Sequence, residues 1–307
     1  MTERHLVIGA GPVGRNVAQL LAADGKRVAV GTRSGTDTGI DGVEHLSLDA
    51  SDVEALSAAT EGAAVIYNCA NPADYTTWQK FWPPLAKSFL AAAERSGAVY
   101  AITGNLYPYG PVDEPMREDM PDAATDHKGR LRAGMWADAK ALHDAGRIRT
   151  VEVRGSDYVG TGVGDNGHVT RQIPGALQGK RSMVIGRKDQ PHTFTDVLDT
   201  ARLLVAAAGD EPALGRTWHV PSNPARTQEE AINDVLASVG KPQVLVSAIP
   251  GPIFSATSLV VPLVRELKQL SYQWTKPYIL DDSAARAHFG MEPTPWDEVC
   301  RRSAVVA

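Results

Sequence analysis

Near the N-terminus, glycines have the spacing of a turn that binds phosphate. A GxGxxG pattern directly follows the apolar run 5–8. In such a turn the first glycine allows the chain to leave a strand sharply, and the second removes a side chain where a pyrophosphate approaches. The third lets a helix pack closely on the strand, and the free N–H groups at the start of that helix attract phosphate oxygens. We therefore expect a dinucleotide to bind here. The turn residues are Gly9, Gly11, Pro12, Val13 and Gly14.

The segment 27–34 indicates which dinucleotide. It reads as the next parallel strand, so a βαβ unit closes within about 30 residues. NAD-binding chains tend to place a carboxylate at the end of this strand, but here Thr32, Arg33 and Ser34 stand there and the next carboxylate is Asp37. A guanidinium offers a fork of donors and a permanent charge to a 2′-phosphate. The sequence therefore predicts NADP(H) as the preferred cofactor, with NAD(H) as the alternative.

The composition excludes several other classes of protein. The 307 residues are 43% hydrophobic with a net charge of −5, which argues against a nucleic-acid surface. Cys69 and Cys300 lack the spacing of metal ligands, and two isolated cysteines fit a reducing cytoplasm. The chain enters a strand at once, so no signal peptide is expected. The apolar stretch 253–264 is too short for a membrane span, and we expect a buried or pocket-lining helix there.

Apolar strands alternate with helical patterns along the first half of the chain. Strands are expected at 44–48, 64–69, 99–103 and 150–154, and helices at 53–60, 78–96 and 131–145. This alternation predicts an α/β fold of Rossmann type, with a doubly wound parallel sheet whose carboxyl strand ends meet on one rim. The second half is less regular, with helices expected at 195–208 and 228–239 and strands at 216–220 and 244–249.

In their order and spacing, the short motifs resemble those of the NAD-dependent epimerase/dehydratase family, the extended short-chain dehydrogenase/reductases. The resemblance implies that Asp49 and Ala50 meet the adenine. It also implies that the end of the strand at Cys69, Ala70 and Asn71 lies beside the cofactor ribose. By the same resemblance, the strand that continues into Gly155 and Ser156 lies under the nicotinamide. Further matches are Thr103-Gly104-Asn105 with the turn Tyr109-Gly110, the segment 192–199 and the strand 218–222.

The resemblance also implies two lobes. Residues 1–161 and 191–221 would form the NADP(H)-binding domain, and 162–190 with 222–307 a smaller, mainly C-terminal substrate lobe. A small-molecule substrate would then bind in the cleft between them. Members of the family are often dimers, so a homodimer is possible, and neither a membrane nor nucleic acid is expected as a partner.

A catalytic Tyr and Lys, spaced YxxxK on one helix, perform the proton chemistry of that family. In the expected helix 131–145, Lys140 corresponds to the Lys, where it would hold the cofactor ribose, but Trp136 stands at the Tyr position. An indole N–H donates a hydrogen bond and does not give up its proton near neutral pH. Thr103 or Asn105 would hold the substrate oxygen.

Three explanations stay open for the missing phenol. A displaced acid could replace it, with Tyr107, Tyr109 and Tyr158 as candidates by position. Trp136 could instead shape a pocket in which water or the substrate supplies the proton, or the protein could bind NADP(H) without turnover, as a redox sensor.

The resulting prediction is an NADP(H)-dependent oxidoreductase that transfers hydride to or from a small organic carbonyl or alcohol. An NAD-dependent sugar-nucleotide epimerase or dehydratase is the alternative within the family. His127 and Arg132 flank the polar stretch 116–132, which we expect to overhang the cleft as a solvated loop. Charged contacts of these two residues to the substrate are the alternative. Trp78 and Trp82 could line the pocket, but burial against neighbouring helices is the favoured expectation.

Overall fold

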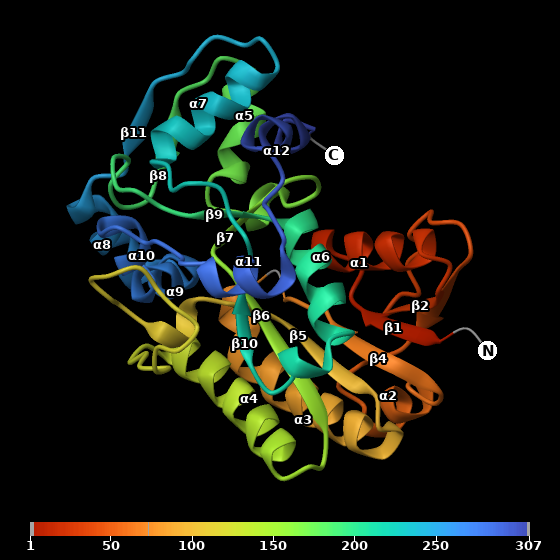
Figure 1. Cartoon of the computed structure of the whole chain (residues 1–307). Helices are drawn as coiled ribbons and strands as arrows, with labels where there is room; N and C mark the ends of the chain where they lie inside the picture. The colour runs from red at the N-terminus through yellow and green to blue at the C-terminus, as the bar shows by residue number, and fades with distance from the viewer. Residues whose placement is uncertain (1–2, 73, 306–307) are drawn as a thin grey trace.

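The computed structural model describes residues 3–72 and 74–305, and its centre is a sheet of seven parallel strands. The strand order is β10-β6-β5-β4-β1-β2-β3 (Figure 1). This confirms the predicted α/β fold with a doubly wound parallel sheet. The strands are β1 (Arg4–Ile8), β2 (Arg27–Thr32), β3 (Val43–Ser47), β4 (Ala63–Asn68), β5 (Val99–Asn105), β6 (Arg149–Gly155) and β10 (Thr217–His219).

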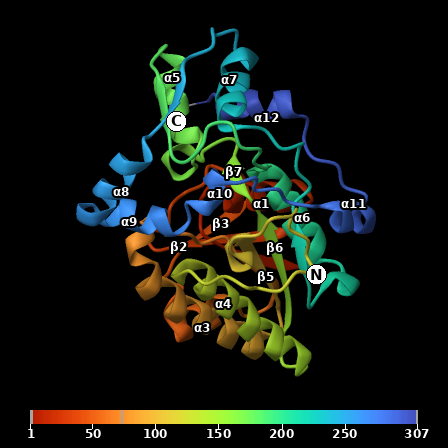
Figure 2. The same cartoon turned by 90° about the vertical axis from the view of Figure 1, so that its left-hand side faces the viewer.

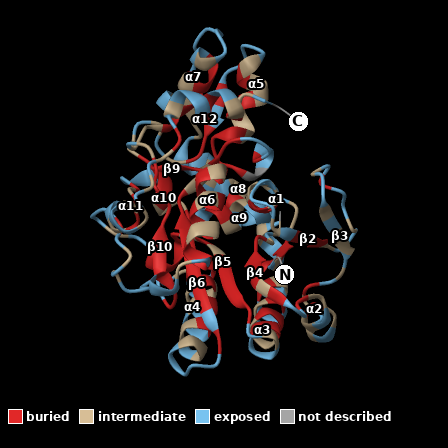
Figure 3. Ribbon diagram, turned by 45° about the vertical axis from the view of Figure 1, so that its right-hand side comes forward, coloured by how far each residue is buried: buried red, intermediate tan, exposed pale blue. Residues whose placement is uncertain are grey.

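Helices cover both faces of the sheet because the strand side chains alternate between two apolar clusters. Leu6 and Ile8 of β1 join the cluster under α2, α3 and α4, whereas Val7 joins the cluster under α1 and α6. Figure 1 shows the two helix layers, and Figure 3 shows the buried sheet between them. The helices are α1 (Pro12–Ala23), α2 (Val53–Ala59), α3 (Trp78–Ser96), α4 (His127–Asp144) and α6 (Val197–Ala208).

The order of the strands reverses beside β1, which lies between β2 and β4. In open α/β sheets a crevice forms at such a point, outside the carboxyl ends of the strands. Here the turn from β1 to α1 borders it. Gly9 has φ +105°, and a Cβ added there would meet the Cys69 carbonyl oxygen at 2.7 Å. A Cβ on Gly14 would lie 2.0 Å from the Gly9 carbonyl oxygen, so α1 starts in backbone contact with this turn.

A smaller C-terminal region packs beyond the sheet, as Figure 2 shows from the side. Val169, Ile232 and Cys300 belong to its own apolar cluster. The region includes α5 (Ile173–Leu177), α7 (Gln228–Ser238), α8 (Gly251–Val260), α9 (Pro262–Gln269), α10 (Tyr272–Thr275), α12 (Trp296–Ser303) and the paired strands β8 (Ser182–Val184) and β11 (Val246–Ala248). The pair β7 (Asp157–Val159) and β9 (Phe194–Asp196) connects it to the sheet.

Parts of the predicted substrate lobe pack against the apolar clusters of the sheet. Leu267 of α9 and Trp274 of α10 belong to the cluster under α2, α3 and α4. Helix α11 (Ser283–Phe289) places Ala285 and Phe289 in the apolar cluster of the sheet, beside Trp218 of β10. The predicted boundaries of the lobes otherwise stay a prediction.

Two predicted elements differ from the structure. Helix α4 begins at His127 rather than 131, because Asp126 caps it by accepting from the Gly129 N–H at 2.9 Å. The apolar stretch 253–264 is not buried: Ile253, Leu259 and Val260 are between 59% and 78% exposed. Among the described residues, no helix is long and apolar enough to cross a bilayer.

A buried ion pair joins the C-terminal region to β7. The Asp157 carboxylate lies 3.1 Å from His192 Nε2 and accepts from the Trp274 indole N–H, also at 3.1 Å. Burial alone would raise the pKa of Asp157. The contact with the His192 imidazole outweighs burial and, with help from Trp274, lowers the pKa of Asp157 to about 2.

Replacing Gly14 by Ala should destabilise the fold, because the added methyl group collides with backbone that cannot rotate away. We expect the free energy of unfolding to fall by about 1–3 kcal/mol or more. Gly134→Ala on α4 is the control, since a Cβ there meets nothing within 4 Å, and it should stabilise by about 1 kcal/mol. Urea unfolding measures both, and an unchanged Gly14→Ala would contradict the close approach.

Asp157→Asn should cost about 2 kcal/mol of unfolding free energy near neutral pH, because the folded state favours the carboxylate form. Since the pKa of Asp157 is lowered by folding, this contribution is present above pH 4 and is lost as the pH falls towards 2. The difference between wild type and Asp157→Asn should therefore shrink steadily below pH 4 in urea titrations. A difference independent of pH would refute the ion pair, and Asp113→Asn at an exposed pair is the control.

Candidate functional site

A cavity of about 960 Å³ opens at the carboxyl ends of the central strands. Three residues predicted to act here do not line it, namely Gly14, Ser34 and Lys140. The predicted residues that the structure brings together around it are Gly9, Gly11, Pro12, Val13, Thr32, Arg33, Asp49, Ala50, Cys69, Ala70, Asn71, Thr103, Asn105, Gly155 and Ser156.

The wall formed by the β1–α1 turn fits a pyrophosphate. Gly11 is the N-cap of α1, no side chain caps the helix, and its first turn holds no carboxylate. A Cβ added at Gly11 would meet no atom within 4 Å, so the turn leaves open space over the helix start. The first N–H groups of α1 are thus available to phosphate oxygens. Gly14 acts from behind this wall, by allowing the helix to approach Gly9.

At the β2 end of the cavity, Arg33 is exposed and lines the wall beside Thr32. Its guanidinium makes no hydrogen bond to another residue of the described chain. The neighbouring Asp49 accepts from the Ser51 N–H and hydroxyl at 2.9 and 2.7 Å, and these bonds, aided by the Arg33 charge, lower the pKa of Asp49. Ser34 instead shares a hydrogen bond of 2.6 Å with Thr36. The carboxylate at this end is therefore already satisfied, and the Arg33 donors are free.

The register of α4 differs from the one predicted. Lys140 makes an exposed ion pair with Asp144 at 2.6 Å, two turns away from the residues of α4 that reach the cavity. Trp136 packs partly buried against the apolar cluster of α3. Among the described residues of α4, Arg132 lines the cavity, and the buried Lys128 lies one turn earlier, spaced i, i+4 from it as in YxxxK. The earlier start of the helix explains the shift, and the structure gives no support for a role of Lys140 at the cofactor.

The sequence suggested that Arg132 lies on a solvated loop, but in the structure Arg132 is buried. It donates to the Thr103 carbonyl oxygen at 2.7 Å, and its guanidinium carbon lies 4.7 Å from the centre of the Trp82 ring. Glu152 is 4.0 Å away but is held by Arg154 at 2.7 Å. Burial therefore lowers the pKa of Arg132, and Glu152 compensates only in part. His127, by contrast, is exposed as expected.

Lys128 was missed by the sequence analysis. It is buried, forms an ion pair with Glu266 of α9, and lies 5.7 Å from the centre of the Tyr75 ring, which lines the cavity. Asp126, as a helix start signal, could have revealed that Lys128 and Arg132 share the inner face of α4. Glu266, the partner of Lys128 on α9, is 138 residues away and carried no such signal.

The three candidate phenols have different surroundings. Tyr158 lines the cavity and donates to the Gly104 carbonyl oxygen at 2.6 Å. Tyr107 also lines it, but its hydroxyl is paired with that of Tyr75 at 3.0 Å. Tyr109 lies outside the lining and is bonded to His219 at 2.8 Å. Burial raises the pKa of each phenol, so all three stay protonated at neutral pH.

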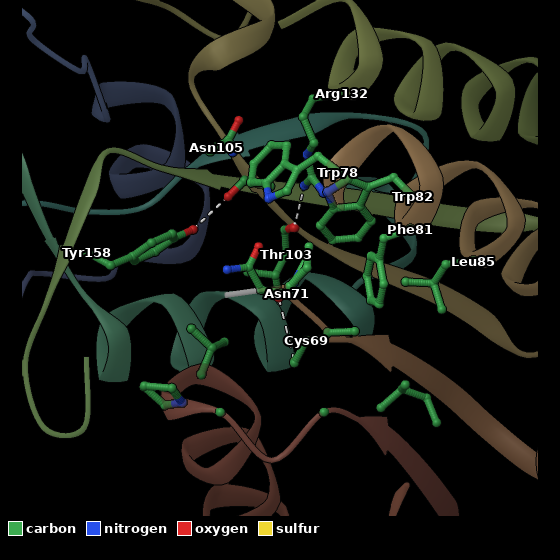
Figure 4. Close-up of a pocket in the computed structure, with 18 of the residues that line it drawn as sticks. Cys69, Asn71, Trp78, Phe81, Trp82, Leu85, Thr103, Asn105, Arg132 and Tyr158 are labelled. Carbon is green, nitrogen blue, oxygen red and sulfur yellow. Dashed lines mark hydrogen bonds between the residues drawn. The ribbon is translucent and has the colours of Figure 1, made fainter. Parts of the chain in front are cut away.

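The end of β5 carries both residues predicted to hold a substrate oxygen. The Thr103 hydroxyl faces Cys69 Sγ at 3.6 Å, and the Asn105 side-chain oxygen accepts from the Tyr107 N–H at 3.2 Å. Tyr158 reaches the carbonyl of the residue between them. Figure 4 shows the three side chains around one end of the cavity.

An apolar wall from α3 also lines the cavity, formed by the aromatic residues Trp78, Phe81 and Trp82 and by Leu85 (Figure 4). Trp78 and Trp82 are buried, as predicted, and both also line the cavity. The ring planes of Trp78 and Tyr107 are nearly parallel, with centroids 6.1 Å apart. The arrangement can therefore hold a dinucleotide along the sheet and a compact organic molecule between α3, α4 and β5.

Comparisons with known proteins agree with this architecture. The model of the NAD dependent epimerase/dehydratase family matches residues 5–220, whereas no curated protein matches the sequence.

Solved structures share the fold at low sequence identity. UDP-glucose 4-epimerase of Thermotoga maritima, solved with UDP-glucose, has a TM-score of 0.80 and 14% identity, covering 98% of this chain and 97% of that one. The dTDP-glucose 4,6-dehydratase of Bacillus anthracis, solved with NAD, has a TM-score of 0.79 and 14% identity over 99% and 96% of the two chains. UDP-glucose 4-epimerase of Thermus thermophilus, solved with NAD, has a TM-score of 0.77 and 17% identity over 98% and 97%. At these identities the structures establish the fold alone.

The family model spans more than half of the chain, and its match includes the glycine turn and the β5 strand end that border the cavity. The chain therefore belongs to the NAD dependent epimerase/dehydratase family.

Proposed function

We propose that this protein binds NADP(H) in the cavity and transfers hydride to or from a small organic carbonyl or alcohol. The observation that carries the proposal is the guanidinium of Arg33, which makes no hydrogen bond to another described residue. It lies beside Thr32 at the end of β2, where residues 32–34 include no carboxylate. A 2′-phosphate would receive charge-assisted hydrogen bonds from this fork, whereas a 2′-hydroxyl needs none of its charge.

The chain's own residues would divide the remaining work. The start of α1 would hold the pyrophosphate, Asp49 and Ala50 the adenine side, and Gly155 and Ser156 the far end of the cofactor. When bound, the nicotinamide supplies or accepts the hydride. Thr103 and Asn105 would orient the substrate oxygen by donating hydrogen bonds to it.

We assign proton donation to Tyr158. Its hydroxyl donates to the carbonyl of Gly104, the residue between Thr103 and Asn105, and would turn from that carbonyl to the substrate oxygen. Burial raises the pKa of Tyr158, with Arg132 opposing that effect. A phenol that keeps its proton at neutral pH is a hydrogen-bond donor and an acid towards an alkoxide, but a poor base. The site is therefore better suited to carbonyl reduction than to alcohol oxidation.

Two other functions are favoured by particular observations. The family match supports a sugar-nucleotide epimerase or dehydratase, and such a protein would retain NAD through purification. The presence of Lys128 and Arg132, rather than a phenol, on the inner face of α4 supports an NADP(H) sensor without turnover. Analysis of the nucleotide released on denaturation tests the first, and an absence of hydride transfer over a broad carbonyl panel would favour the second.

Arg33→Ala should remove the preference for NADPH. In fluorescence titrations we expect the wild type to bind NADPH at least about tenfold more tightly than NADH, a difference of about 1.4 kcal/mol. The variant should make the two affinities equal, because it weakens the binding of NADPH and leaves the binding of NADH unchanged. Equal affinities in the wild type, or a preference unchanged by the substitution, would overturn the cofactor assignment.

Tyr158→Phe should lower the rate of carbonyl reduction by about 100-fold or more while NADPH binding persists, because the acid is lost but the ring remains. Tyr109→Phe is the matched control, since that phenol lies outside the cavity lining. The decay of NADPH absorbance in steady state measures both. Wild-type turnover in Tyr158→Phe would remove this tyrosine from the mechanism.

A further inference from the structure

Three buried hydrogen-bond donors gather without acceptors on one wall of the cavity. They are the Nε of Arg132 and the indole nitrogens of Trp78 and Trp82, none of which has a partner within the described chain. All three residues line the cavity and are at most 3% exposed. Unpaired buried donors cost stability, so such a cluster needs an explanation.

The three groups are adjacent. The Arg132 guanidinium lies over the Trp82 ring at 4.7 Å, and the Trp78 and Trp82 rings meet edge to face with centroids 5.9 Å apart. Figure 4 shows both indoles beside the end of Arg132, next to Thr103. The cluster thus borders the place where the substrate oxygen would be held.

These groups are donors only. Neither an indole N–H nor a guanidinium can accept a hydrogen bond, so the three cannot satisfy one another. A hydroxyl or a neutral amide would bring its own hydrogen atoms into the cluster. A group that carries only acceptor oxygens and a negative charge would satisfy all three.

The charge of Arg132 points the same way. Glu152 is the nearest carboxylate, at 4.0 Å, but it is bonded to Arg154 at 2.7 Å, and Arg154 also holds Asp122 at 2.6 Å. The Glu266 carboxylate forms an ion pair with Lys128. Arg132 therefore lacks a carboxylate of its own, although it is buried.

We propose that Arg132 and the indole N–H groups of Trp78 and Trp82 receive an oxyanionic group of the substrate, a carboxylate or a phosphate. This deepens the proposed function and rests on it: the reducible carbonyl would lie at Thr103 and Asn105, and the oxyanion next to it on the α3–α4 wall. The apolar side chains of Phe81 and Leu85 would contact the body of the substrate.

Calorimetry on the full chain, with and without saturating NADP⁺, tests the proposal with three probes. Benzoylformate carries a carboxylate, methyl benzoylformate is its neutral ester, and phenyl phosphate carries a phosphate. We expect at least one anion to bind the wild type about tenfold or more tightly than the ester, since hydrogen bonds to a charged group are strong. The tighter anion names the group. Two anions no tighter than the ester would overturn the proposal.

Variants separate the donors from the rest of the site. Arg132→Gln should bring the anion and the ester to equal affinity, whereas Arg130→Gln, on the exposed face of the same helix, should keep the preference. Trp82→Phe keeps one aromatic ring and removes the N–H together with part of the indole, so it should weaken binding of the anion several-fold and change binding of the ester much less. If Arg132→Gln does not fold, as judged by circular dichroism, Trp82→Phe and Trp78→Phe carry the test alone.

The outcomes distinguish this proposal from the proposed function. A wild type that binds no NADP⁺ defeats the proposed function, while the anion preference is still measured without cofactor. If Arg132→Gln weakens the binding of NADP⁺ and keeps the preference for the anion, these donors serve the cofactor. That result would overturn the proposal.

Discussion

The contact between the start of α1 and the turn that leaves β1 is the constraint on which the site depends. Gly14 and Gly9 approach so closely that no side chain fits between them, and Gly9 in turn lies against the Cys69 backbone. The start of α1 is thereby held at the carboxyl ends of β1 and β4. Its free N–H groups, the loop after β2 and the ends of β4 and β5 then face one cavity.

The inner face of α4 gives the site its individual chemistry. Two buried cationic side chains, Lys128 and Arg132, are spaced i, i+4 on this face, whereas the resemblance placed the catalytic pair at Trp136 and Lys140. Lys128 is neutralised by a carboxylate from α9, whereas Arg132 shares its nearest carboxylate with Arg154. A helix of this kind cannot supply the usual phenol, and it brings a buried positive charge that is compensated only in part. The incomplete compensation matters because Arg132 is buried, since an exposed arginine would be solvated.

Much of the fold was predictable because it depends on local patterns. Apolar strands alternating with helices indicated the parallel sheet, and the glycine turn with Arg33 located the cofactor end of the cavity. The inner face of α4 was not predicted, since Lys140 was chosen by analogy and the cap at Asp126 was overlooked. The exposure of 253–264 and the pairing of Lys128 with Glu266 depend on contacts between distant segments. Periodicity along one chain carries no information about such contacts.

A crystal structure of the protein with NADP⁺ would test the central claim most directly. We expect the pyrophosphate at the start of α1, the 2′-phosphate within hydrogen-bond distance of Arg33, and the nicotinamide beside Thr103 and Tyr158. Electron density that places the dinucleotide outside this cavity, or its 2′-phosphate in solvent away from Arg33, would contradict the account.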